Sequence, residues 1–190
     1  VNSTNTTTNN TAFAITVAGF SDGRRTWYVN CSDAAGNIGT SATRNFTIDT
    51  TAPTVTLNAP ANLTNTTSTS MTFNWTATDA LRTTMTCNLT LDGTVRYTET
   101  SLDESTVTTT RTISSISEAI HTWNVTCADD LGNSASSATR TFTVDNTAPA
   151  VTLNSPANLT NTSNTNPTFN WTATDVLSSA MTCNLTIDGS

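Results

Sequence analysis

Few side chains in this sequence could do covalent chemistry. There are four cysteines, one histidine and no lysine: Cys31, Cys87, Cys127, Cys183 and His121. A serine or cysteine nucleophile usually needs a histidine base, and His121 alone could supply one. Neither a CxxC pair for zinc nor a phosphate-binding glycine loop occurs. The absence of lysine excludes a Schiff base and a Lys–Asn isopeptide bond. We therefore expect no catalytic residues and no enzyme.

The composition favours strands over helices and argues against nucleic acid as a partner. Among 190 residues, 48 are Thr and 22 are Asn, and only 11% are charged. Such chains favour turns and half-exposed strands over helices. The net charge of −7 argues against nucleic acid as a partner. No apolar run reaches the roughly 20 residues that span a bilayer. The sequence begins without Met or a signal peptide, so we expect a processed product or a segment of a longer protein.

An internal repeat with a period of 96 residues organises the chain. Residues 51–93 align without gaps to 147–189, with 32 of 43 positions identical, and 27–50 align to 123–146 with 13 of 24 identical. This period suits one small β-sandwich per repeat. The segment Thr-Ala-Pro, at 51–53 and again at 147–149, is expected to be a hinge. Residues 51–146 are then one complete domain, 1–50 the C-terminal half of a domain (strands about D/E-F-G) and 147–190 the N-terminal half (strands A-B-C).

Alternating apolar residues predict the strands of residues 51–146. The positions expected to face the core are Val55 and Leu57 on strand A, Phe73, Trp75 and Ala77 on strand B, Met85, Cys87, Leu89 and Leu91 on strand C, Trp123, Val125 and Cys127 on strand F, and Phe142 and Val144 on strand G. A less regular region around Val107 and Ile113 should hold one or two further strands. Turns are expected at Asp92-Gly93 and Leu131-Gly132-Asn133. By the same alternation, Trp27 and Trp171 should be core residues of the flanking halves, and His121 a corner residue before a strand.

A motif recurs with the repeat: W-x-V-x-C-x-D, then G-N, then F-T-(I/V)-D-x-T-A-P. It is carried by Trp27, Val29, Cys31, Asp33, Gly36, Asn37, Phe46, Asp49 and Pro53, and again by Trp123, Val125, Cys127, Asp129, Gly132, Asn133, Phe142, Asp145 and Pro149. The motif resembles the immunoglobulin-like tandem repeats of prokaryotic surface proteins and adhesins, and the lysine-free composition suggests an archaeal one. This resemblance implies an all-β fold of tandem immunoglobulin-like antiparallel β-sandwiches, about 96 residues each.

The resemblance also implies how the cysteines pair. Antibody domains carry Cys on strand B and Trp on strand C, whereas Trp75 and Cys87 reverse these roles. A Cys87–Cys127 disulfide would therefore join strands C and F within one sheet; the alternative is a pair of buried free thiols. Cys31 and Cys183 occupy the F and C positions of the two half domains. Since the complete domain separates them, either the chain belongs to a longer covalent array, or residues 1–50 of one subunit complete residues 147–190 of its neighbour with an intermolecular Cys31–Cys183 bond.

Signals for N-linked glycosylation are dense. N-x-S/T sequons occur at Asn2, Asn5, Asn9, Asn30, Asn45, Asn62, Asn65, Asn74, Asn88, Asn124, Asn158, Asn161, Asn170 and Asn184. A chain rich in Thr and Asn produces some sequons by chance. However, those on predicted strands fall on the outward phase, where a glycan would reach solvent. We expect several of them to carry N-linked glycans.

Aspartates are predicted to converge at the junctions between domains. Asp49 precedes the hinge, Asp79 ends strand B, and Asp129 or Asp130 follows strand F, and all should lie at the same pole of the domain. Several carboxylates in one place suit Ca²⁺, so a calcium site at the interdomain junction is one expectation. Asp145 and Asp175 repeat the arrangement, with Asp33 of a neighbour as the third member. The alternative is that these residues only form turns.

Together these observations lead to one functional expectation and one rival. We expect a structural repeat of an extracellular, glycosylated surface filament or stalk, built head to tail with further copies of itself. The rival is an adhesin module whose target, a surface, a glycan or another cell, would be bound by the variable stretches 1–26 or 97–122.

Overall fold

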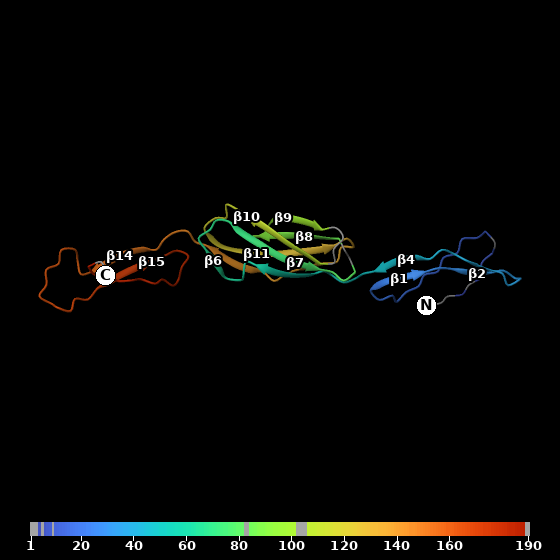
Figure 1. Cartoon of the computed structure of the whole chain (residues 1–190), viewed down its shortest axis with the longest axis horizontal. Coiled ribbons are helices and arrows are strands. Elements are labelled where there is room, and N and C mark those ends of the chain that lie inside the picture. The colour runs from blue at the N-terminus through green and yellow to red at the C-terminus, as the bar shows by residue number, and fades with distance from the viewer. Residues whose placement is uncertain (1–3, 5, 9, 82–83, 102–105, 189–190) are drawn as a thin grey trace.

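The computed structural model describes residues 4, 6–8, 10–81, 84–101 and 106–188 of the chain. All regular secondary structure in these ranges is β-structure. Figure 1 shows three parts following one another along the long axis: an N-terminal segment (residues 1–50), a central unit (51–146) and a C-terminal segment (147–190). The described part of the chain has no helix that is long and apolar enough to cross a membrane.

The central unit consists of two sheets. In the first, β7 (Met71–Thr78) lies between β5 (Thr54–Ala59) and β10 (Thr106–Ile113), and both pairings are antiparallel. The second sheet has the order β6-β13-β11-β8-β9, with β12 also paired to β11. Its strands are β6 (Thr64–Thr66), β13 (Arg140–Val144), β11 (Ala119–Asp129), β8 (Met85–Leu91), β9 (Thr94–Ser101) and β12 (Ser134–Ser136). Among the described strands, only the short β6–β13 pairing is parallel.

The core lies between these sheets, where the alternation in the sequence placed it. Phe73 and Trp75 on β7 and Val125 on β11 are fully buried, and all the predicted inward positions belong to the core except Val55, which is partly buried against it. Phe73 packs edge to face on Trp123, with ring centroids 5.0 Å apart. This contact joins the two sheets, so the central unit is a β-sandwich.

The predicted turns are confirmed. Asp92 and Gly93 form a two-residue loop between β8 and β9, and both have positive φ, 51° and 75°. Two such residues match the type I′ turn whose twist suits a tight hairpin. The irregular region after this hairpin contains β9 and β10; Ile113 is partly buried against the core, and the Val107 side chain lies outside the described residues.

The N-terminal segment contains two small sheets. In one, β1 (Gly23–Trp27) pairs with β4 (Arg44–Ile48), and in the other β2 (Asn30–Ser32) pairs with β3 (Ile38–Thr40). Shifted by 96 residues, these registers are those of β11 with β13 and of β11 with β12.

The C-terminal segment contains one pair of strands, β14 (Ala150–Ser155) and β15 (Asn170–Thr174). They reproduce the register of β5 with β7, including the irregularity between Leu57 and Ala59, which recurs between Leu153 and Ser155. These two pairs therefore have the same register in both copies.

The strands of the single chain differ from the predicted ones in several places. Residues 181–187, equivalent to β8, are not a strand, because β8 is held by β9 and β11 and the C-terminal segment has neither neighbour. For the same reason, no D/E strand forms in the described residues before β1. The sequence patterns also missed the short strands β6 and β12, whose polar residues show no alternation.

Two of the four predicted core tryptophans are not buried in the single chain. Trp75 and Trp123 are 0% and 1% exposed, whereas Trp27 and Trp171 are 47% and 37% exposed. Trp27 is equivalent to Trp123, and Trp171 to Trp75, so the side chains are the same and only the covering strands differ. His121 also departs from its expected corner: it lies within β11 and is buried.

Candidate functional site

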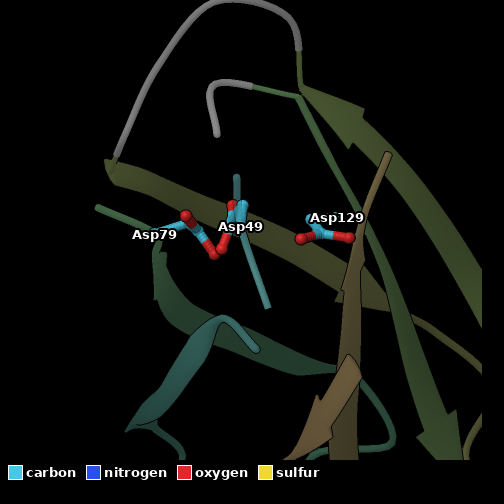
Figure 2. A group of neighbouring side chains, drawn as sticks. All are labelled: Asp49, Asp79 and Asp129. Atoms are coloured by element: carbon cyan, nitrogen blue, oxygen red, sulfur yellow. The ribbon is translucent and has the colours of Figure 1, made fainter. Parts of the chain in front are cut away.

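Three aspartates meet where the N-terminal segment joins the central unit. Asp49 follows β4, Asp79 follows β7, and Asp129 is the last residue of β11. One carboxylate oxygen from each lies within 4.8 Å of the others. All three residues are buried, at 7%, 6% and 7% exposure. Figure 2 shows the carboxylates of Asp49 and Asp79 facing each other, with Asp129 beside them. The predicted convergence is therefore present.

Each of these aspartates also shapes its own loop. Asp49 Oδ1 accepts a hydrogen bond from Thr51 N (3.1 Å), and Asp79 Oδ1 accepts one from Leu81 N (2.9 Å). Asp129 Oδ1 accepts from Leu131 N at 2.9 Å. This bond to the amide two residues later is the pattern by which Asp and Asn initiate turns. Turn formation, the alternative to a metal site, thus accounts for one carboxylate oxygen of each aspartate.

The second carboxylate oxygens of Asp129 and Asp49 differ in their partners. Asn133 Nδ2 donates to Asp129 Oδ2 (2.8 Å) and also to the main-chain oxygen of Asp49 (3.3 Å), so it connects the turn after β11 to the linker. Asp49 Oδ2 is buried and has no hydrogen-bond donor among the described residues. A buried carboxylate oxygen without a donor is costly, since the charge has lost its water. This oxygen is the feature of the group that most requires a partner.

The other predicted metal ligand does not join the group. Asp130 is exposed and lies outside the set of three. Of the equivalent residues in the repeat, Asp145 and Asp175 are half-buried and Asp33 is exposed. Asp33 bonds Asn37 as Asp129 bonds Asn133, and hydrogen bonds from the Asn37 side chain and main chain lower the pKa of Asp33 below its ordinary value.

The linkers on both sides of the central unit begin with the same contact. Thr51 Oγ1 donates to Asp22 Oδ2 at 2.7 Å, and Thr147 Oγ1 donates to Glu118 Oε2 at 2.8 Å, 96 residues later. Hydrogen bonds from the Thr51 hydroxyl, and next from Thr50 N, hold the pKa of Asp22 below its ordinary value. The sequence pattern did not reveal this contact, because Asp22 lies in the stretch where the copies diverge.

Cys87 and Cys127 form a disulfide. They are paired residues on β8 and β11, so the bond lies within one sheet, as predicted, and the free-thiol alternative is wrong for this pair. Cys31 and Cys183 are exposed free cysteines in the single chain.

The C-terminal segment leaves an apolar hollow open. Its cavity volume is about 270 Å³, and its walls include Val151, Leu153, Trp171, Met181, Cys183 and Leu185. In the central unit the equivalent side chains face Trp123, Val125 and Phe142, which come from the second half of the sandwich. The hollow thus lies on the side of these residues that β11 and β13 cover in the central unit.

The sequon asparagines lie at the surface wherever the structure describes them. Those that are exposed or half-buried are Asn30, Asn45, Asn62, Asn65, Asn74, Asn88, Asn124, Asn158, Asn161, Asn170 and Asn184. Asn2, Asn5 and Asn9 lie outside the described residues. Some of these side-chain amides also make hydrogen bonds within the protein. For example, Asn74 Nδ2 donates to Thr110 Oγ1 at 2.6 Å.

Two further residues with structural roles escaped the sequence patterns. Arg140 Nη2 donates to the main-chain oxygen of Leu57 (2.7 Å), and Nη1 donates to that of Pro60 (2.8 Å). His121 binds Asp92 Oδ2 through Nδ1 (2.7 Å) and the main-chain oxygen of Ser117 through Nε2 (2.8 Å). Arg140 recurs as Arg44 in the repeat, which was a usable signal, whereas His121 is replaced by Arg25.

Comparison with known proteins adds no assignment. Neither a protein-family model nor a curated protein matches this sequence.

Proposed function

We propose that this chain is a structural repeat of an extracellular filament or stalk, in which immunoglobulin-like sandwiches follow one another head to tail. The observation that carries the proposal is the different burial of identical side chains. Leu57, Met85 and Leu89 are 7%, 1% and 0% exposed in the central unit. Their equivalents Leu153, Met181 and Leu185 are 78%, 37% and 49% exposed.

The N-terminal segment has the complementary surface. Trp123 and Val125 are 1% and 0% exposed, whereas their equivalents Trp27 and Val29 are both 47% exposed. In the central unit these two sets of side chains cover each other. Residues 1–50 of a neighbouring repeat or subunit therefore have the shape and polarity to complete residues 147–190.

The total surface supports the same conclusion. A compact protein of 20.0 kDa is expected to expose about 8,700 Å². This chain exposes 13233 Å². Part of the excess lies on apolar side chains of the two outer segments, such as Trp27, Leu153 and Trp171. Exposed apolar patches of this kind mark association sites.

The N-terminal and C-terminal segments also carry polar groups whose equivalents are bonded to each other in the central unit. Arg44, the equivalent of Arg140, is exposed, and the Leu153 carbonyl corresponds to the Leu57 carbonyl that Arg140 binds. Cys31 and Cys183 correspond to the bonded pair Cys127 and Cys87. We propose that the Cys31–Cys183 bond forms across the junction, and that the sequons carry glycans at the surface of the array.

Two single-cysteine variants of the chain test this proposal. In an oxidised mixture of C31S and C183S, head-to-tail completion would bond Cys183 of the first to Cys31 of the second, and each variant oxidised alone should stay a single chain. We expect a covalent product that stops at two chains on a non-reducing gel, and a ladder of multiples from the unmodified chain. Quenching of tryptophan fluorescence by acrylamide should fall as assembly proceeds, because Trp27 and Trp171 become covered. A chain that stays monomeric at every concentration, or closes on itself through Cys31 and Cys183, would contradict head-to-tail completion.

A further inference from the structure

We propose that Asp49, Asp79 and Asp129 bind one divalent cation, Ca²⁺ by the chemistry of the donors, at the junction before the central unit. The three carboxylates supply only oxygen, within 4.8 Å of one another. Calcium takes six to eight oxygen ligands and accepts carboxylates, carbonyls and waters in flexible geometry.

The burial of the group provides an independent reason for a ligand. Asp49 is 7% exposed, and its Oδ2 is buried with no donor among the described residues. The carboxylate of Asp49 lies beside that of Asp79 (Figure 2). A buried carboxylate oxygen without a donor costs free energy unless a cation or a proton donor compensates it. Asp49 Oδ2 is thus the oxygen that a cation would take first.

The choice of Asp rather than Asn separates ligand binding from turn formation. Asn initiates the same turns as Asp, and this chain uses Asn freely, with 22 residues. Yet the three positions carry Asp in each copy of the repeat that the chain contains, as Asp33, Asp49, Asp79, Asp129, Asp145 and Asp175. Six of only 14 acidic residues therefore stand at these positions. Turn geometry alone does not require the negative charge.

The three residues come from separate segments, which gives the site a mechanical effect. Asp49 belongs to the linker. Asp79 follows β7 in one sheet of the central unit, and Asp129 is the last residue of β11 in the other sheet. A cation held by all three would fasten the linker to both sheets at once. It would therefore limit bending between consecutive sandwiches.

Calcium titration of the full chain after removal of metal with EDTA tests the site. Extracellular modules bind Ca²⁺ with Kd of about 10⁻⁴–10⁻³ M, so 10 mM CaCl₂ should raise the Tm of the central unit by about 10 °C. Hydrogen exchange should show the amides of residues 49–52 becoming protected in Ca²⁺. D130N, which removes one exposed charge from the adjacent residue, should keep the full shift.

The variant D49N distinguishes a ligand from a structural residue. Asn keeps an Oδ1 that can accept from Thr51 N, so the variant should fold. In EDTA, D49N should be as stable as the unmodified chain or more so, because an uncompensated buried charge has been removed. In Ca²⁺ it should be less stable, since the shift is lost. Equal Tm of the unmodified chain in EDTA, CaCl₂ and MgCl₂ would overturn the proposal, as would a D49N variant that is destabilised equally in EDTA and Ca²⁺.

Discussion

Cys87 and Cys127 are directly paired residues on neighbouring antiparallel strands, and their disulfide lies within a single sheet. The two residues are also at the centre of the core, at 4% and 0% exposure. The space between the sheets, which the disulfide of antibody domains crosses, is filled here by Trp75, Trp123 and Phe73.

Removing this disulfide should destabilise the central unit. The bond closes a loop with a sequence separation of 40, which contributes about 4 kcal/mol on the chain-entropy model. We expect the double variant C87A/C127A to lose about 2–5 kcal/mol in urea unfolding monitored by circular dichroism. A reductant should destabilise the unmodified chain and leave the double variant unchanged. The variant C31S should not alter unfolding of the central unit in the unassembled chain.

Replacing Arg140 by lysine should also destabilise the central unit. The guanidinium binds two main-chain oxygens, those of Leu57 and Pro60, and both residues are buried. One ammonium cannot reproduce the forked geometry, so one carbonyl loses its partner. We expect R140K to cost about 1–3 kcal/mol, measured by the same urea unfolding. R44K changes the equivalent, exposed residue and should cost nothing in the unassembled chain; equal losses in both variants would contradict this account.

The contact between Asp22 and the linker should depend on pH. Hydrogen bonds from Thr51 and Thr50 lower the pKa of Asp22 in the folded chain. The contact is therefore fully formed at a pH above the pKa of Asp in an unfolded chain, about 3.9. It should be lost as the pH falls through the folded pKa. An NMR titration of the Asp22 carboxyl carbon should show a midpoint below the ordinary range.

The variant T51A tests the cause of this shift. Removing the hydroxyl that contributes most should move the Asp22 midpoint upward, toward the ordinary Asp value. T147A removes the equivalent hydroxyl at the second junction and should leave Asp22 unchanged. An Asp22 midpoint that is the same in T51A and the unmodified chain would assign the shift to other groups.

A circular permutant should form two complete sandwiches in one chain. Residues 51–190 would be followed by Val-Arg, copied from Val95 and Arg96, and then by residues 1–50. We expect a monomer in light scattering, two disulfides in peptide mapping (Cys87–Cys127 and Cys31–Cys183), and all four tryptophans protected from acrylamide. Persistent exposure of Trp27 and Trp171 in this permutant would show that the two segments do not fit each other.

The sequence by itself determined what depends on neighbours along the chain. The period of 2 in Phe73, Trp75 and Ala77 specified which side chains face the core, since alternate residues of a strand point to opposite faces. Asp92-Gly93 specified a hairpin, because positive φ at two consecutive positions favours this dipeptide. Where both strands of a pair lie in one segment, as with β14 and β15, residues 96 positions apart pair in the same register.

Only the tertiary structure decided what depends on contacts between distant segments. Trp75 and Trp171 stand in nearly identical local sequences, yet one is buried and the other exposed, because burial needs the strands β11 and β13 on the opposite side of the core. Likewise, Asp129 and not Asp130 joins Asp49 and Asp79, since Asp129 ends β11 on the buried phase of that strand, whereas Asp130 lies exposed in the turn that follows. Local pattern fixes the direction of each side chain, whereas the packing of the two sheets decides which side chains meet.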